Sequence, residues 1–480
     1  MTETTLKQKT AKGLLWGSIS SSMQLIISLA CGIVFARVLS QEDYGLTAVL
    51  SVFIAVSGVL IESGFTTGLI NRKKIEYADY NAVFWVSLLL GLSIYLILFL
   101  AAPLIAAFFD DNRLIILSRI MFLWIISSSL SIAPGALMQK ELKIKSRAIV
   151  SVCSIFTSSI IGIIIVLLGY GYWGIVVQLV SQSIVSAILL WCFSSWHPNF
   201  SFDFQPIKEI FPFSIKMLLT GLITQINANI LTVFLGRLFT KNELGTYTQG
   251  NKWSGLTTTF VSGIIQGVAQ PVFVEAGNNP ERQANVFRKM LRFCSFISFP
   301  LLFGLAFISP ELIPILITDK WLDSILIMQL TCIWGAFSVI GNLYTQLVIS
   351  HGKSNIYFWN TIILGITQII LLLCIHSWGI TRMLIGFLFI NFSWLIIWHY
   401  YANKFIRLRF RDVMKDIMPY LLITCIAIGC SYFISLYIEN IYIRCIQKIV
   451  TTAAMYLLVT WQMNSVIFKE SIDYILKKTK

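Results

Sequence analysis

Charged residues are scarce in this chain of 480 residues. Asp, Glu, Lys and Arg together make up 12% of it, and its mean hydropathy is +0.79. Soluble domains carry about 25% charged residues, and a soluble protein of this length could not hide so much apolar surface. The composition therefore excludes a soluble enzyme or binding domain and indicates a membrane protein.

The sequence also lacks the clusters that hold metals or disulfide frameworks. Its nine cysteines are scattered singly, without a C-x-x-C pair, and its four histidines lie far apart along the chain. Single cysteines in apolar segments are typically small buried hydrophobic side chains. We therefore expect no disulfide framework, no metal site and no cofactor.

Long apolar runs fill the chain from end to end. A bilayer-spanning helix needs ~20 mostly apolar residues, and about fourteen runs meet that need. Strands of a membrane barrel would alternate in hydrophobicity, whereas these runs are apolar on all sides. The sequence therefore predicts an all-α polytopic membrane protein. The expected spans are 14–38, 46–70, 82–108, 114–138, 148–168, 174–195, 212–236, 246–271, 289–317, 324–349, 356–376, 380–402, 416–437 and 446–467.

The formal net charge of +14 is unevenly distributed between the loops. The first apolar run is longer than a signal-peptide core and lacks a small-x-small cleavage site, so it should remain as the first span. With the N-terminus inside, most Lys and Arg residues fall on the cytoplasmic side, as the positive-inside rule requires. We therefore expect a multi-pass protein of the inner membrane with both termini in the cytoplasm. Because topology accounts for the charge, we expect no nucleic-acid partner.

The chain partly repeats itself. Residues 35–45 read FARVLSQEDYG and residues 235–245 read LGRLFTKNELG, which share an Arg, a hydroxyl residue, an acid and a Gly in order and without a gap. Parallel repeats of several membrane helices are a transporter architecture. We therefore predict two pseudosymmetric six-helix lobes followed by a helix pair. The expected parts are an N-lobe 1–195, a cytoplasmic linker 196–210, a C-lobe 211–402 and a C-terminal pair with a basic tail, 403–480.

One stretch of the first lobe carries a family resemblance. Residues 62–72 read ESGFTTGLINR and residues 81–85 read NAVFW, and shorter phrases such as QKELK at 139–143 and GYWG at 171–174 accompany them. These phrases resemble the polysaccharide transporter family, and in particular its Wzx-type O-antigen and colanic-acid exporters. The chain departs from that family at Asn227 and Asn229, where relatives often carry an Asp.

The resemblance implies a substrate and a mechanism. Members of this family flip a polyprenyl-pyrophosphate-linked oligosaccharide from the inner to the outer leaflet, and their superfamily also contains multidrug and toxin extrusion carriers. By that resemblance we expect alternating access, a lipid-linked oligosaccharide as substrate, membrane lipids as surroundings, H⁺ or Na⁺ as a coupling ion, and a monomer.

An anionic sugar–pyrophosphate head must cross the membrane in a hydrated, cationic cavity, so basic residues within spans are candidate binding residues. Arg119 and Lys252 lie ~8 Å inside the fourth and eighth spans, at 1.5 Å per residue. Positive charge in the outer half of a span gains nothing from topology, so we predict that these two hold the pyrophosphate, although snorkelling to the interface is the alternative. Further candidates are Arg37 and Arg237, where a helix dipole already stabilises a cation, and Lys216 and Arg292, which the positive-inside rule already explains.

Glu62 is the acid deepest in a predicted span, ~12 Å from the inner end of the second. A carboxyl group in an apolar interior holds a proton more readily unless a cation pairs with it. Glu62 is therefore a candidate for carrying a coupling proton or for binding Na⁺, and the alternative is a salt bridge that fixes helix packing. Amides on the seventh and eighth spans, among them Gln225, suit either sugar hydroxyls or bonds between helices.

Two other functions remain open. A multidrug-type cation antiporter would favour acids in its cavity, whereas the embedded basic residues here outnumber Glu62. A membrane glycan polymerase or ligase would need a sizeable outer loop with paired catalytic residues. The predicted outer loops are short and contain no Asp/Glu pair at catalytic spacing, so we expect a transporter and not an enzyme.

The predicted topology can be tested by cysteine labelling in a variant without the native cysteines. A membrane-impermeant maleimide should label Thr2→Cys and Thr479→Cys only after permeabilisation, because both termini are expected in the cytoplasm. Tyr170→Cys, in the predicted outer loop between the fifth and sixth spans, should be labelled in intact cells. Labelling of either terminus from outside intact cells would contradict the topology.

Overall fold

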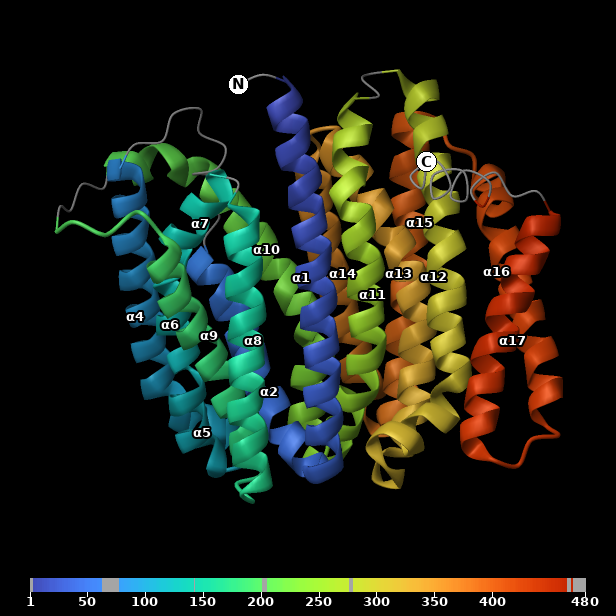
Figure 1. Cartoon of the computed structure of the whole chain (residues 1–480), viewed down its shortest axis with the longest axis horizontal. Helices are drawn as coiled ribbons and strands as arrows, with labels where there is room; N and C mark the ends of the chain where they lie inside the picture. The colour runs from blue at the N-terminus through green and yellow to red at the C-terminus, as the bar shows by residue number, and fades with distance from the viewer. Residues whose placement is uncertain are drawn as a thin grey trace. The chain divides into compact units, whose positions relative to one another are not determined.

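The computed structural model describes residues 3–62, 77–141, 143–200, 205–275, 279–463 and 468. The described residues are almost entirely helical and include no strand. Figure 1 labels the elements. They are α1 (Glu3–Val38), α2 (Gln41–Glu62), α4 (Tyr77–Phe109), α5 (Arg113–Met121), α6 (Leu123–Ser129), α7 (Ile132–Lys140), α8 (Ile144–Leu167), α9 (Trp173–Phe193), α10 (Gln205–Leu238), α11 (Lys241–Glu275), α12 (Pro280–Ile317), α13 (Ser324–Ser350), α14 (Ser354–Ile375), α15 (Ile380–Ile406), α16 (Phe410–Ser435) and α17 (Ile441–Gln462), with the short 3-10 helices η1 (Asp319–Trp321) and η2 (His376–Trp378).

As far as the structure describes them, the predicted spans each lie on one of these helices, except that the fourth is divided among α5, α6 and α7. Residues 63–70 of the second predicted span and 464–467 of the last lie outside the described residues. Thirteen helical segments in the described part of the chain are long and apolar enough to cross a membrane. The predicted eighth span, on α11, is not among them, because polar residues such as Gln249, Asn251 and Lys252 interrupt its apolar character. The prediction of an all-α protein with many membrane spans is confirmed.

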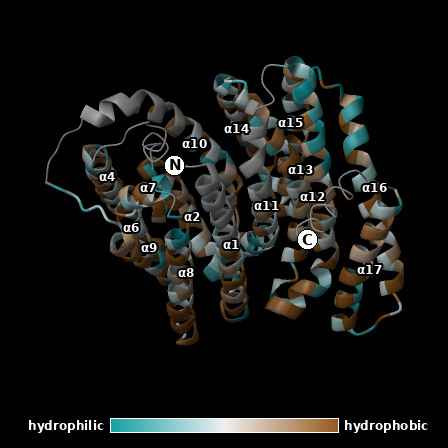
Figure 2. Ribbon diagram, turned by 45° about the horizontal axis from the view of Figure 1, so that its top comes forward, coloured by the Kyte–Doolittle hydropathy of each residue, from teal (hydrophilic) through white to brown (hydrophobic). Residues whose placement is uncertain are grey.

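The outer surfaces of the helices are those of a membrane protein. Figure 2 shows hydrophobic residues along the helices and hydrophilic residues near many of their ends. Leu100 and Leu104 on α4 are 67% and 72% exposed, and Phe389 on α15 is 70% exposed. In water such side chains would form a large unfavourable patch, whereas lipid tails solvate them well.

The chain forms two compact units, Met1–Gly245 and Thr246–Lys480. In the first unit α8 lies between α1 and α9, while α10 packs on α2 and α4. In the second unit α12 contacts α13, α16 and α17, and α15 packs on α13 and α14. The division at Gly245 follows α10, and the six-helix lobes remain a prediction.

The fourth span is broken for an identifiable reason. Pro134 has no N–H, so it cannot donate to the carbonyl of Leu130 as a continuous helix requires. That carbonyl instead accepts a hydrogen bond of 2.9 Å from Nε1 of Trp191 on α9. The hydroxyls of Ser129 and Ser131 donate hydrogen bonds to backbone carbonyls of the preceding turn. Such side-chain bonds compete with the regular backbone hydrogen bonds of a helix. The span therefore changes geometry between α6 and α7.

The described part of the predicted linker is bound to α4. Trp196 is 4% exposed and packs on Phe84, with ring centroids 5.7 Å apart. The backbone of Asn199 donates to Oδ1 of Asn81 at 2.8 Å and accepts from Nε1 of Trp85 at 2.9 Å. Helix α10 begins at Gln205, inside the range predicted as linker.

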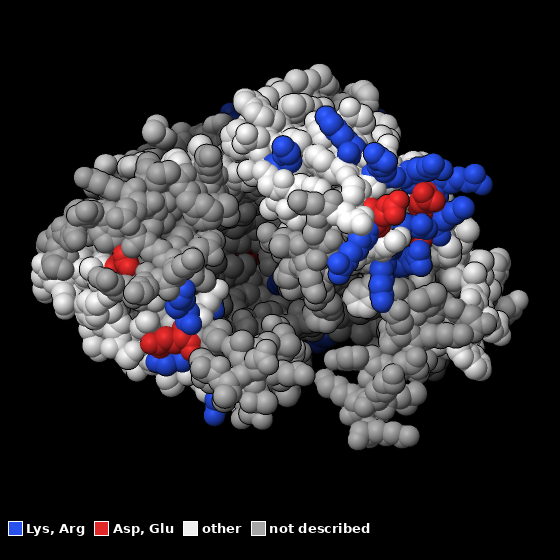
Figure 3. Space-filling view, turned by 90° about the horizontal axis from the view of Figure 1, so that it is seen from above, with Lys and Arg blue, Asp and Glu red and all other residues white. Residues whose placement is uncertain are grey.

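Basic side chains gather at one end of the second unit, where α12, α14 and α16 begin and α13 and α15 end. Seen from above, Figure 3 shows them around a few acidic side chains. The predicted topology places this end in the cytoplasm, where the positive-inside rule expects such charge. The exposed members are Arg282, Lys289, Lys353, Lys404, Arg407, Arg409, Arg411 and Lys415.

Two buried ion clusters tie the C-terminal helices to α12. Glu311 on α12 is 3% exposed, and its Oε1 lies 2.7 Å from Nζ of Lys448 and 3.0 Å from Nε of Arg444, both on α17. Near the other end of α12, Asp416 of α16 contacts Arg288 at 2.6 Å and Arg292 at 2.7 Å. Each carboxylate is therefore shared by two cations across a helix–helix contact.

Breaking the Glu311 cluster should destabilise the protein. Removing one member of a buried ion pair typically costs about 3–5 kcal/mol because the other charge stays buried and unpaired. We expect Glu311→Gln and Lys448→Met each to lower the melting temperature of the purified protein, and the double variant to lose less than the two single changes together. The matched control is Lys415→Met at an exposed position. Wild-type melting temperatures for both single variants would contradict this role.

Candidate functional site

Among the cavities lined by described residues, three matter for function, and we name each after one lining residue. The largest, the Arg147 cavity, has a volume of about 760 Å³ and lies within the first unit. Helices α2, α6, α7, α8, α9 and α10 form its walls. Its polar lining side chains are Ser51, Glu62, Ser128, Ser131, Gln139, Arg147, Ser151, Ser186 and Gln225.

The broken fourth span supplies one wall of the Arg147 cavity. Trp124, Ser128, Ser131, Gly135 and Gln139 all line it, at the three- and four-residue spacing that keeps side chains on one helical face. In membrane proteins irregular backbone is tolerated where it lines a cavity or is buried in protein. The break between α6 and α7 therefore lies where the fold can accept it.

Arg147 projects from the first turn of α8. Its backbone N–H donates to the carbonyl of Lys143 at 3.1 Å, so the helix is already formed at this residue. The next residues on the inward face, Ala148 and Val150, are buried at 7% and 2% exposure, whereas Arg147 is exposed and lines the cavity. Packing of the apolar face thus fixes the helix and leaves the guanidinium accessible.

Trp124 forms the flat part of the cavity wall. It is half-buried on α6 and lies against Gly58 of α2, where an added Cβ would be 3.4 Å from Cη2 of the indole. The absence of a side chain at Gly58 therefore lets the indole lie close to α2. An indole combines an apolar face with an N–H donor, which suits a ligand with both apolar and polar faces.

The lining is mostly apolar, and its polar members can bind an anionic group that carries hydroxyls. A guanidinium binds phosphate or carboxylate oxygens through two parallel hydrogen bonds. The amides of Gln139 and Gln225 and the serine hydroxyls can both donate and accept hydrogen bonds. Among the described residues no group of three or more His, Cys, Asp or Glu side chains is placed to hold a metal ion.

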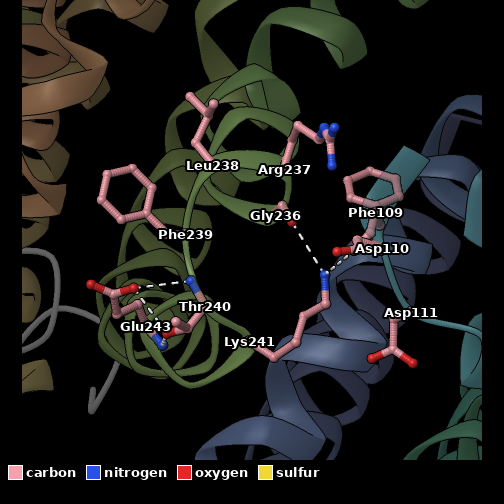
Figure 4. Close-up of a pocket in the computed structure, with 10 residues that line it drawn as sticks. All are labelled: Phe109, Asp110, Asp111, Gly236, Arg237, Leu238, Phe239, Thr240, Lys241 and Glu243. Carbon is pink, nitrogen blue, oxygen red and sulfur yellow. Dashed lines mark hydrogen bonds between the residues drawn. The ribbon is translucent and has the colours of Figure 1, made fainter. Parts of the chain in front are cut away.

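The second cavity, the Lys241 pocket, has a volume of about 390 Å³ (Figure 4). It lies where α4 and α10 end and α11 begins. Nζ of Lys241 donates to the carbonyls of Phe109 at 3.0 Å and Gly236 at 3.2 Å. A cation at helix C-termini satisfies carbonyls that lack a partner within the helix, so Lys241 ties the ends of α4 and α10 together.

Acidic residues surround Lys241. Asp110 and Asp111 line the pocket, and Asp110 has a φ of 54°, in the left-handed region. Burial acts to raise the pKa of Asp111, but hydrogen bonds from Arg113 outweigh it and hold that pKa below its usual range. Arg113 also contacts Glu42 at the start of α2. This network joins the ends of α2, α4 and α5.

The two repeated phrases meet beside this pocket. A Cβ on Gly45 would overlap the carbonyl oxygen of Lys241, and a Cβ on Gly245 would overlap that of Gln41. The two glycines therefore permit a reciprocal close approach of the first turns of α2 and α11.

Each repeated phrase also begins its helix with a capping box. Oδ2 of Asp43 accepts from the backbone N–H of Ser40 at 2.8 Å, and the Ser40 hydroxyl accepts from the N–H of Asp43 at 3.2 Å. Thr240 and Glu243 make the same pair of bonds at 3.0 and 3.3 Å. The shared hydroxyl and acid thus satisfy the first N–H groups of both helices.

The third cavity, the Phe296 cavity, lies in the second unit and has a volume of about 580 Å³. It is lined by α11, α12 and α17, mostly with Phe, Ile, Leu, Pro and Ala side chains. Lys448, Tyr456 and two threonines are its polar members. Such a cavity suits a hydrocarbon chain better than a sugar.

The predicted site residues lie in different places. Glu62 lines the Arg147 cavity, but it is exposed there, which corrects the expectation of a deeply buried carboxylate. Arg237 lines the Lys241 pocket, and its guanidinium carbon lies 5.6 Å from the centre of the Phe108 ring. Arg37 is exposed at the end of α1.

The remaining candidates line none of these three cavities. The guanidinium carbon of Arg119 lies 4.4 Å from the centre of the Phe99 ring on α4, and Lys252 is half-buried on α11 in the second unit. Arg292 is engaged with Asp416, and the side chain of Lys216 lies outside the described residues.

Sequence reasoning missed Trp124, Gln139 and Arg147 as site residues. Arg147 lies at the cytoplasmic end of a predicted span, so it belongs to the charges that the positive-inside rule already explains. The regular spacing of polar and small residues from 124 to 139 was the available signal.

Comparison with known proteins identifies a protein family that this chain matches. A family model described as "Polysaccharide biosynthesis protein" matches residues 34–326. The teichuronic acid biosynthesis protein TuaB of Bacillus subtilis (strain 168) is 22% identical over 456 residues, which cover 92% of each chain. The lipopolysaccharide biosynthesis protein WzxC of Escherichia coli (strain K12) is 24% identical over 359 residues, covering 74% of this chain and 72% of WzxC.

Solved structures share the fold. The lipid II flippase MurJ, in an inward closed conformation, superposes with a TM-score of 0.74 at 17% identity, covering 96% of this chain and 100% of MurJ. An inward-facing multidrug resistance MATE transporter gives a TM-score of 0.63 at 15% identity, covering 80% of this chain and 94% of that transporter.

Proposed function

This chain belongs to the polysaccharide biosynthesis protein family, and from this premise we propose that it flips a polyprenyl-pyrophosphate-linked oligosaccharide across the inner membrane by alternating access. The observation that carries the proposal is the Arg147 cavity of about 760 Å³, which places Arg147, Glu62, amides and serine hydroxyls among apolar side chains within a unit whose outer surface is apolar. A carrier for a charged sugar head needs such a cavity, because the head would otherwise lose its hydration in the hydrocarbon core.

The names of the relatives support the substrate class. TuaB is named for teichuronic acid biosynthesis, WzxC for lipopolysaccharide biosynthesis, and ExoT of Rhizobium meliloti (strain 1021) is a succinoglycan biosynthesis transport protein. MurJ, which shares the fold, is a lipid II flippase. A lipid-linked saccharide is the substrate class that fits this set of names.

The lipid part of such a substrate needs no polar path. Its tail can stay among lipid chains while the head crosses inside the protein. The Phe296 cavity, lined almost wholly by apolar side chains, can accept a segment of that tail. Arg119 and Lys252 remain proposed contacts for the pyrophosphate, and the six-helix lobes remain the proposed moving parts.

Coupling to an ion gradient is part of this proposal. Glu62 lines the Arg147 cavity and is exposed there, so H⁺ or Na⁺ can reach its carboxylate through water. The likeness to a MATE transporter also raises cation antiport as a second candidate. Arg147 in the largest cavity disfavours that function, because it repels a cationic drug.

The proposed function predicts the phenotype of a deletion strain that has no second carrier. Surface glycan should be lost, lipid-linked saccharide should accumulate in the inner leaflet, and the wild-type gene should restore display. Arg119→Ala and Lys252→Ala should restore it poorly at matched protein levels, because each removes a proposed phosphate contact. The matched control is Lys415→Ala, at an exposed position in the basic patch.

Two results would count against this account. Unchanged glycan display in the deletion strain would reject the flippase assignment. Full restoration by both Arg119→Ala and Lys252→Ala would reject those two residues as phosphate contacts and leave the assignment intact.

A further inference from the structure

We infer that the Arg147 cavity is a sugar-phosphate subsite, in which Arg147 binds the phosphate and Trp124 packs against the adjoining sugar ring. This inference rests on the proposed function, since it concerns how the head of a lipid-linked saccharide is held. It concerns two residues that neither the family match nor the relatives' names single out.

Arg147 differs from three other cations of the described helices in what surrounds it. Arg292 is paired with Asp416 at 2.7 Å and Lys448 with Glu311 at 2.7 Å. Lys241 donates to two backbone carbonyls. Within the described residues, Arg147 has no carboxylate at ion-pairing distance.

Arg147 also lines the largest of the three cavities. A cation at the edge of a membrane-spanning helix is costly unless water or an anion reaches it. Packing has already fixed the backbone of α8, so the guanidinium is presented to the cavity without further ordering of the helix. An anionic ligand in the cavity would therefore gain a charge-assisted hydrogen bond at little conformational cost.

Trp124 supplies an apolar, flat surface in the same cavity. A sugar ring has one face rich in C–H groups and a rim of hydroxyls, so it packs on a flat aromatic surface while its hydroxyls stay hydrogen-bonded. Close contact with Gly58 supports one side of the indole, and the half-exposed remainder of Trp124 lines the cavity. This gives the platform a fixed position relative to α2.

Polar side chains on α6, α7 and α10 suit the rim of such a ring. Ser128 of α6, Gln139 of α7 and Gln225 of α10 line the same cavity. Amides offer both donors and acceptors, as sugar hydroxyls require. The volume of about 760 Å³ falls in the range of roughly 300–1,000 Å³ for small-molecule sites, so the subsite holds the sugars next to the phosphate and not a long glycan.

The inference is tested with four variants and one matched control. Arg147→Gln and Trp124→Ala should each lower the rate of glycan export by about tenfold or more, as expected when a charge-assisted hydrogen bond or a packed ring is lost. Arg147→Lys keeps the positive charge and Trp124→Phe keeps an aromatic ring. These two variants should therefore retain more export than Arg147→Gln and Trp124→Ala. Lys145→Gln, an exposed neighbour on α8 that does not line the cavity, should export at the wild-type rate.

A binding measurement separates loss of the site from loss of the fold. The probe is the lipid-linked saccharide extracted from the deletion strain, titrated against the full-length purified protein in detergent. Arg147→Gln and Trp124→Ala should bind it about tenfold more weakly than wild type, while eluting as the same monodisperse species.

The outcomes are distinguishable from those of the proposed function. If the wild-type gene restores glycan display and Arg147→Gln and Trp124→Ala restore and bind equally well, the subsite is refuted and the flippase assignment stands. If Arg147→Lys and Trp124→Phe lose glycan export as completely as Arg147→Gln and Trp124→Ala, the roles assigned to the charge and the aromatic ring are refuted. If the wild-type gene restores nothing, the flippase assignment itself falls.

Discussion

Every backbone polar group in the hydrocarbon core must find its hydrogen-bond partner within the protein, and the structure of this chain follows from that constraint. It dictates helices in place of open strands, and it decides where helices can be interrupted. The carbonyl of Leu130, which Pro134 leaves without a donor, is satisfied by Trp191. The carbonyls of Phe109 and Gly236 are satisfied by Lys241. Against this background the guanidinium of Arg147, exposed in a cavity and without a carboxylate partner among the described residues, is where we propose that a ligand binds.

The same constraint explains the repeated phrase. Its hydroxyl and acid close the first turns of α2 and α11 by equivalent capping boxes. Its glycine lets each of these turns approach the backbone of the other, because a side chain at Gly45 or Gly245 would overlap a carbonyl. The phrase is therefore a structural element used twice. The Arg of its second copy, Arg237, reaches the Lys241 pocket.

The membrane-spanning helices could be predicted from the sequence, whereas the residues that line the candidate site could not. Apolar runs of sufficient length predict spans directly, because lipid selects for them all round the helix. The site depends on which faces meet, and hydropathy does not contain that information. Arg147 looked like a topological charge, and the Glu311–Lys448 pair joins residues distant in sequence. Glu62 was expected to be buried, yet it lines a cavity, because the neighbouring helices leave an open space beside α2. The pairing of the two repeated phrases was likewise not predictable, since a shared motif does not reveal its contacts.

The central claim is that this protein moves a saccharide head through the membrane while the lipid tail stays outside. Its most direct test is reconstitution of the purified protein into liposomes that contain a lipid-linked saccharide with a fluorophore on its sugar. A membrane-impermeant reductant quenches the fluorophore only in the outer leaflet. The account predicts that the wild-type protein exposes the inner-leaflet pool to quenching, and that protein-free liposomes keep about half of the fluorescence protected, as two equal leaflets require. An equal protected fraction with and without the protein, in the presence and absence of a H⁺ or Na⁺ gradient, would contradict it.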